Sequence, residues 1–126
     1  MDLKSIRIEI LKLIRNYAPR NTEFYWHNDT RNSVGFCKAK YCRINKVFYD
    51  YEIGISHKFA VSHKREEVLN IAIQEIAHAR TLGKGIKEWI SEYKRLKSII
   101  GKEDTGNKSK EKEQKDEKAP GMPGAA

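Results

Sequence analysis

Residues 63–81, HKREEVLNIAIQEIAHART, constrain the fold more than any other stretch of the chain. Apolar side chains occur on nearly every side of a helix drawn through them: Val68, Leu69, Ile71, Ala72, Ile73, Ile76, Ala77 and Ala79. A helix that is apolar all round is buried. We therefore predict a buried central helix, with Ser62 or His63 as its N-cap, that other elements must cover from several sides.

The polar residues of this helix form a pattern of their own. Asn70, Gln74 and His78 are spaced by four, so they lie along one line of the helix, and Glu75 adjoins that line. A buried polar group without a partner costs about 1–3 kcal/mol. The line therefore predicts either hydrogen-bonding partners or a polar cavity beside the helix.

Two further helices are predicted at the ends of the folded part. Residues 2–18 carry an apolar stripe at three- and four-residue steps and stop before Pro19, as an amphipathic helix does. Residues 86–100 carry a similar stripe, and Gly101 is the predicted terminator. Both helices have one apolar face that can pack on a common core.

Three strands are predicted at 22–28, 33–44 and 47–56, where β-branched and aromatic residues are frequent. Short links favour an antiparallel meander. In the third strand one face is predicted to hold Val47, Tyr49, Tyr51, Ile53 and Ile55. Because strands and helices are segregated along the chain, the predicted fold class is α+β, with a three-stranded antiparallel sheet.

Charge divides the chain into two regions. The 126 residues include 25 Lys and Arg against 17 Asp and Glu, a net charge of +8. Residues 101–126 lack aromatic and β-branched aliphatic side chains and balance six lysines with six acids, which predicts a disordered charged tail after a domain at 1–100. The whole excess of positive charge therefore belongs to residues 1–100, which favours polyanionic partners such as nucleic acid.

Other classes are disfavoured by composition. No apolar run reaches the roughly 18 residues of a membrane span, so no membrane partner is expected. Charges interrupt the apolar residues at the N-terminus, unlike a signal peptide. Cys37 and Cys42 are two isolated cysteines, which we interpret as ordinary strand residues and not as a disulfide framework. A cytoplasmic, intracellular location is predicted.

Residues 74–78, Gln-Glu-Ile-Ala-His, match a zinc-helix motif of the H-E-x-x-H type except at the first histidine. They stand in a wider order of motifs: 35–37 (GFC), 53–56 (IGIS), 66–69 (EEVL) and 83–89 (GKGIKEW). In this order and spacing the chain resembles the SprT-like family over residues 22–100. Members of that family are small zinc metallopeptidase domains that cut proteins crosslinked to DNA.

The resemblance implies a zincin-like fold, with Glu75 as the general base and His78 as one metal ligand. Gln74 stands at the family's first ligand position and Gly85 at its third, and neither is a usual zinc ligand. The expected cofactor is therefore none, or zinc only if the site is rebuilt with another histidine, for which His27 and His57 are the candidates.

A second candidate site is the basic segment of the second strand and the turn after it. Arg31, Lys38, Lys40, Arg43 and Lys46 alternate there with the aromatic residues Trp26, Phe36 and Tyr41. Basic and aromatic residues on a strand surface suit phosphates and stacked bases. A solvated sheet face over core aromatics is the alternative interpretation.

Three functions follow as hypotheses. The first is a SprT-like pseudoenzyme that has lost zinc-dependent catalysis and binds DNA or a DNA-bound protein. The second is an active zinc metallopeptidase with a rebuilt metal site and Glu75 as its base. The third is a protein–protein interaction module that uses the charged tail. The predicted domain is followed by the charged tail and not by a cysteine-rich zinc ribbon. Compact family members without the ribbon are the sort found in phages and mobile elements, so the resemblance implies a viral origin.

Overall fold

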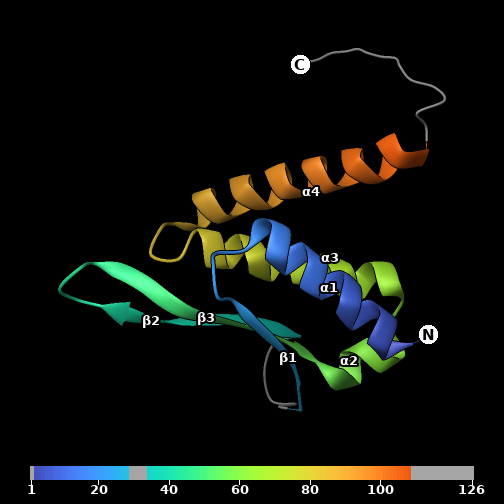
Figure 1. Ribbon diagram of the computed structural model, residues 1–126, viewed down its shortest axis with the longest axis horizontal. Coiled ribbons are helices and arrows are strands. Elements are labelled where there is room, and N and C mark those ends of the chain that lie inside the picture. Colours follow the sequence, from blue (N-terminus) through green and yellow to red (C-terminus); the bar gives the residue numbers. More distant parts are fainter. Residues whose placement is uncertain (1, 29–33, 109–126) are drawn as a thin grey trace. The chain divides into compact units, whose positions relative to one another are not determined.

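The computed structural model describes residues 2–28 and 34–108, which form an α+β fold (Figure 1). The chain divides into two compact units, residues 1–94 and 95–126. In chain order the elements are α1 (Leu3–Tyr17), β1 (Glu23–His27), β2 (Gly35–Cys42), β3 (Val47–Ser56), α2 (His57–Ser62), α3 (Arg65–Arg80) and α4 (Ile86–Lys108). The α+β class and the three strands are confirmed.

The sheet is mixed, with strand order β1-β3-β2. β2 pairs with β3 in antiparallel fashion, whereas β1 lies on the other side of β3 and runs parallel to it. The predicted antiparallel meander is therefore wrong for β1. β3 is the central strand, and its Ile53 and Ile55 are fully buried. A strand with a neighbour on each side can be buried in this way, which suits the apolar end of β3.

Both α1 and α3 lie on one face of the sheet (Figure 1), so α3 is covered by the sheet below and by α1 beside it. The prediction of a buried central helix is confirmed. Fully burying one such aliphatic side chain contributes about 1.5–3 kcal/mol. The core residues of these elements are Ile6, Ile10 and Ile14 of α1, Phe24 of β1, Ile53 and Ile55 of β3, and Val68, Ala72, Ile73, Ile76, Ala77 and Ala79 of α3.

The central helix starts later than predicted. Residues 57–62 form the separate short helix α2, capped by Ser56, whose hydroxyl accepts from the Phe59 N–H at 3.1 Å. The N-cap of α3 is Lys64, and its main-chain N–H donates to the Glu67 carboxylate at 3.0 Å. The predicted N-cap at Ser62 or His63 is therefore wrong, because an acidic residue in the first turn serves the free N–H instead.

The last helix continues past its predicted end. α4 runs through Gly101 to Lys108, so residues 101–108 of the predicted tail are helical, and the prediction that Gly101 ends the helix is wrong. A Cβ at Gly101 would meet nothing within 4 Å, so the glycine is a tolerated exposed position that costs about 1 kcal/mol. Residues 109–126, the remainder of the predicted tail, lie outside the described residues.

A β-bulge breaks the predicted alternation of β3. Lys38 pairs with Glu52 but Lys40 pairs with Tyr49, and Asp50 takes a left-handed conformation at φ 53. The extra residue turns Val47 and Tyr49 away from the face of the buried isoleucines, where they were predicted to lie. They stand instead on the same face as Lys38 and Lys40. We call this face, which is opposite to α1 and α3, the outer face of the sheet.

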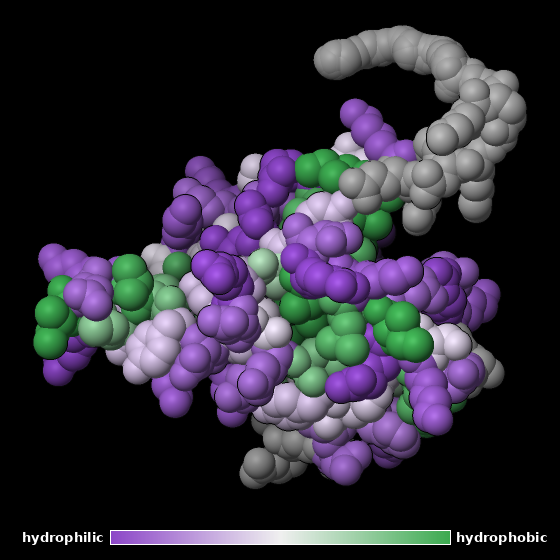
Figure 2. All heavy atoms as spheres, in the orientation of Figure 1, coloured by the Kyte–Doolittle hydropathy of each residue, from purple (hydrophilic) through white to green (hydrophobic). Residues whose placement is uncertain are grey.

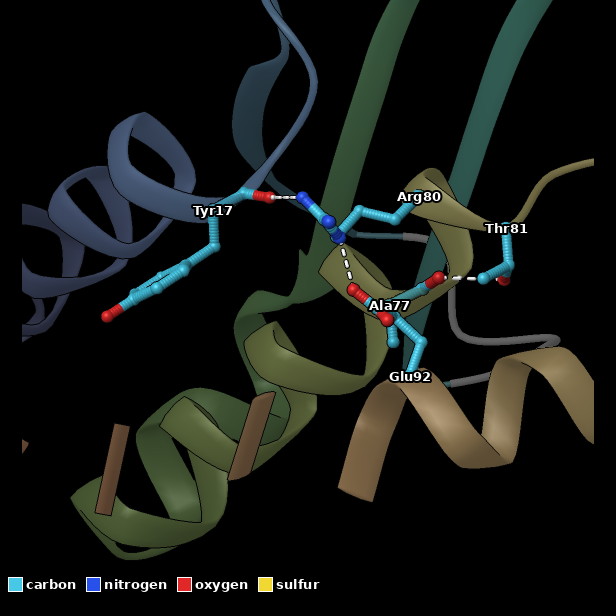
Figure 3. Close-up of polar contacts among 5 residues, drawn as sticks. All are labelled: Tyr17, Ala77, Arg80, Thr81 and Glu92. Atoms are coloured by element: carbon cyan, nitrogen blue, oxygen red, sulfur yellow. Dashed lines mark hydrogen bonds and ion pairs between the residues drawn. The ribbon is translucent and has the colours of Figure 1, made fainter. Parts of the chain in front are cut away.

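Arg80 joins three helices at the C-terminal end of α3 (Figure 3). Its guanidinium donates to the main-chain oxygen of Tyr17, the last residue of α1, at 2.9 Å. The same group forms an ion pair with Glu92 of α4. Beside it, the Thr81 hydroxyl donates to the Ala77 main-chain oxygen at 2.8 Å. Arg80 therefore fixes the start of α4 against α3.

Replacing Arg80 by alanine should lower the free energy of unfolding by about 1–2 kcal/mol, because a charged hydrogen bond and a partly exposed ion pair are both lost. The measurement is a urea titration. Arg7→Ala, at an exposed position of α1, is the matched control and should stay within about 0.5 kcal/mol of the parent. Equal effects of the two substitutions would contradict the bridging role.

Candidate functional site

The polar line of α3 finds its partners on the first turns of α4. The Tyr93 hydroxyl donates to the Asn70 side-chain oxygen at 2.7 Å, and the Trp89 indole N–H donates to the Gln74 main-chain oxygen at 3.1 Å. The His78 ring stacks on the Trp89 ring with 4.5 Å between centroids and 16° between planes. Of the three side chains, Asn70 thus has a hydrogen-bonding partner on α4 and His78 an aromatic one, while the bond to Gln74 involves only its main chain.

His78 lies in this contact as a half-buried, uncharged ring. Desolvation by burial lowers its pKa below the ordinary value of 6.5, so the imidazole is neutral at pH 7. A neutral imidazole can be a zinc ligand, and that alone does not separate a metal ligand from a packed core histidine. The deciding feature is the set of donors around it.

That set does not fit a catalytic zinc ion. Such a site needs three protein ligands and an open position for water. Gln74 offers an amide group, which zinc does not favour as a ligand, and Gly85 has no side chain to offer. Among the described residues, no three His, Cys, Asp or Glu side chains gather where they could hold a metal ion. The two ligand positions that depart from the family pattern are not compensated by neighbours in that part of the chain.

The two histidines considered for a rebuilt site lie elsewhere. His27, at the end of β1, packs its ring against Phe36 with 5.1 Å between centroids. Phe36 covers Gly54 on the outer face, whereas α3 lies on the opposite face of the sheet. His57 is the exposed first residue of α2. The structure therefore does not bring His27 together with His78, because the sheet separates them.

Glu75 points into the interface between α3 and β2. Only 8% of it is exposed, and it lies over Gly35. A Cβ at Gly35 would come within 3.2 Å of the Glu75 Oε2 atom and within 2.7 Å of Ile71. The glycine of the predicted 35–37 motif therefore makes room for a buried carboxyl group. Any larger residue would push the helix away from the strand.

Burial governs the protonation of this carboxyl group. Desolvation raises the pKa of Glu75 to about 7, and within the described residues no hydrogen bond or ion pair to its side chain is found. Across the interface, desolvation and secondarily the Glu75 charge raise the pKa of the Cys37 thiol to about 12. A pKa near 7 suits a general base. The titratable group that interacts with it across the interface, however, is the Cys37 thiol, which stays protonated and cannot act as a nucleophile.

An open hollow of about 420 Å³ lies beside the start of α4. Neither Glu75 nor His78 lines it. Its lining residues are Thr81, Lys84, Lys87, Glu88, Ser91 and Glu92. The predicted catalytic residues therefore do not face this hollow.

The basic residues predicted to bind nucleic acid are concentrated on the β2–β3 hairpin, which extends beyond the helices (Figure 1). Lys38 lies 5.8 Å from the Phe36 ring centroid and 3.7 Å from the Glu52 carboxylate. Lys40 lies 3.5 Å from the Asp50 carboxylate. Both lysines are exposed on the outer face. They are weakly tethered, because exposed pairs of this kind contribute about 0–1 kcal/mol.

Arg43 and Lys46 occupy the turn at the tip of the hairpin, where the sequence predicts a turn at Asn45-Lys46. Arg31 lies outside the described residues. Trp26, predicted among the basic residues, packs instead against Phe24 with 5.0 Å between ring centroids, on the face that holds the core. The basic group that the structure brings together is thus Lys38, Lys40, Arg43 and Lys46.

Several exposed apolar residues near this group were missed from the sequence. Tyr25 is on the outer face and donates its hydroxyl to Glu52 at 3.1 Å. Ile44, Val47 and Tyr49 are exposed at the end of the hairpin, where apolar and hydrophilic side chains are mixed (Figure 2). The sequence did not single out Ile44, because it falls at the end of the predicted strand 33–44.

Comparisons with known proteins found no matching family model, no matching curated protein and no matching solved structure. Within residues 2–28 and 34–108, no helix combines the length and the apolar character needed to cross a membrane. The SprT-like resemblance therefore stays a prediction based on the order of motifs and on individual residues.

Glu75→Gln should change how stability depends on pH. The folded chain raises the Glu75 pKa from 4.5 to about 7, so the stability linked to its proton is complete below pH 4.5 and is lost as pH rises through 7. The loss amounts to roughly 3 kcal/mol. Glutamine does not ionise, so E75Q should gain stability relative to the parent between pH 4.5 and pH 8, measured by urea titration at each pH.

Glu66→Gln makes the same chemical change at an exposed position of α3 and is the matched control. The lowered pKa of His78 acts in both proteins and cancels in the difference. Parallel pH profiles for E75Q and the parent would show that the Glu75 carboxyl group is solvated and not buried.

Proposed function

We propose that this chain is a SprT-like protein that has lost zinc-dependent catalysis and acts by binding DNA through its β2–β3 hairpin. The observation that carries the binding role is the charge of that hairpin. Residues 35–56 contain Lys38, Lys40, Arg43 and Lys46 against Asp50 and Glu52, an excess of two positive charges, and the turn that holds Arg43 and Lys46 contains no acidic residue. A ribbon of this charge on a chain of net charge +8 attracts a polyanion over a long range.

The loss of catalysis is supported by the contacts of the polar line on α3. His78 is stacked on Trp89, and the positions equivalent to the other two ligands hold Gln74 and Gly85. Glu75 faces Gly35 of β2, whereas His78 faces α4. The base and the remaining ligand of the predicted peptidase site therefore serve two separate packing contacts.

The backbone at Lys46 also supports a role for the hairpin tip. Lys46 has φ 57, in the left-handed region that glycine and asparagine adopt at low cost. Lysine at this position costs stability, of order 1 kcal/mol. A charged side chain retained at a strained position fits a function for that charge better than a role in folding.

Lys46→Gly separates the two effects. Glycine relieves the backbone strain, so the free energy of unfolding should stay constant or increase, while removal of the charge should weaken binding to a short DNA duplex. Fluorescence anisotropy at several salt concentrations measures the binding. One phosphate contact fewer should reduce the slope of log affinity against log salt concentration by about 1.

Lys58→Gln is the matched control, because Lys58 is an exposed lysine on α2, at the other end of the sheet from the hairpin tip (Figure 1). Its binding should equal that of the parent. The proposal fails if the parent shows no affinity for DNA at low salt, or if K58Q and K46G weaken binding equally.

A further inference from the structure

The tip of the β2–β3 hairpin presents an aliphatic side chain on a closed turn. The Lys46 N–H donates to the Cys42 main-chain oxygen at 2.7 Å and closes the loop of residues 43–46. Ile44 lies inside this loop and is 90% exposed, more than the other large apolar side chains described. Leaving such a residue in water forgoes the free energy that its burial would contribute. Turn geometry does not require isoleucine, since Gly, Asn, Asp, Ser and Pro are the residues that form turns well.

The bulge at Asp50 enlarges the apolar surface behind the tip. By shifting the register of β3 it places Val47 and Tyr49 outward, where they are 50% and 45% exposed. Tyr41 is 49% exposed and contacts Phe48 with 4.8 Å between ring centroids. The end of the hairpin is thus apolar along its strands and most exposed at Ile44.

Positive charge flanks Ile44 on both sides within the same turn. Arg43 precedes it directly and Lys46 follows two residues later, and neither forms an ion pair with another described residue. Lys40 lies on β2, where it pairs with Tyr49 of β3, close to the tip of the hairpin. An aliphatic tip between two cations is complementary to a surface that offers apolar faces between rows of negative charge.

We propose that Ile44 is a wedge that inserts between stacked base pairs of a DNA duplex, while Arg43 and Lys46 contact phosphates on either side. This inference rests on the DNA-binding function proposed above and adds the form of DNA and the mode of contact. A two-stranded ribbon can lie in the minor groove of duplex DNA, which is the groove from which apolar wedges are inserted. Apolar side chains that enter a base step unstack it partly and kink the duplex by about 20–90°.

Two other occupants fit the hairpin less well. A lipid surface would gain little from one isoleucine, since even a single myristoyl chain gives only marginal membrane binding. A second copy of the chain would bring two hairpins together, each with Lys38, Lys40, Arg43 and Lys46, and their charges would repel. A duplex supplies both the negative charge and the stacked apolar faces.

The test measures binding and bending of the same duplex by the full chain. Fluorophores at the two ends report bending through energy transfer, and 2-aminopurine in the duplex reports unstacking. The parent should bind, increase energy transfer and increase 2-aminopurine fluorescence. Ile44→Ser keeps both flanking charges and replaces the wedge by a good turn former, so it should bind the duplex while both bending signals return to those of free DNA.

Val61→Ser is the matched control, because Val61 is a β-branched residue 58% exposed on α2. It should bind and bend as the parent does. Binding by the parent without bending, or equal bending by I44S and the parent, would overturn the wedge and leave the DNA-binding function standing. If the parent instead binds vesicles of phosphatidylserine and phosphatidylcholine through Ile44 and leaves DNA straight, the occupant is a lipid surface and the wedge is wrong.

Discussion

The contact between the polar line of α3 and the first turns of α4 is the interaction on which the rest of this structure depends. A helix as apolar as α3 must be enclosed, and its few polar residues must be enclosed with it. Trp89 and Tyr93 pack large apolar rings against the helix, and each also donates one hydrogen bond to it. The helix can therefore be buried without an ion in its polar line. In the SprT-like resemblance that same line would be the metal site.

This contact occupies the position that the SprT-like resemblance predicts for a metal. With Gln74 and Gly85 at two of the predicted ligand positions, a metal would contribute little to stability. His78 packs instead against the ring of Trp89. The Glu75 side chain packs against Gly35, and the lack of a side chain there lets the carboxyl group lie close to strand β2. Each retained residue of the motif thus has a contact that does not require catalysis.

The arrangement also divides the molecule into a core face and a free face. Among residues 2–28 and 34–108, α1 and α3 lie on one side of the sheet and neither covers the outer face or the hairpin tip. The bulge at Asp50 sends Val47 and Tyr49 to this side, beside the lysines of β2. A single irregularity in β3 therefore determines how apolar the free surface is.

The sequence predicted the features that depend on local patterns, and it missed those that depend on distant contacts. The burial of α3 and the existence of three strands follow from periodicity alone. The parallel pairing of β1 with β3 does not, because it is decided by which strand occupies the centre of the sheet. The bulge at Asp50 has no signature in a strictly alternating strand.

In the candidate site the same distinction holds. The sequence located the spacing of Asn70, Gln74 and His78 and the need for partners, but the partners, Trp89 and Tyr93, lie 15 and 23 residues from the groups they contact. The basic residues of the hairpin were found from composition. Trp26 was misplaced, because an aromatic residue on a short strand gives no indication of which face is buried.

The zinc content of the purified chain, grown with zinc in the medium, is the most direct test of whether packing has replaced the metal. It is measured by elemental mass spectrometry together with the unfolding temperature in the presence and absence of a chelator. The account predicts zinc far below one ion per chain and an unfolding temperature that the chelator does not change. One zinc ion per chain, whose removal lowers the unfolding temperature, would contradict it.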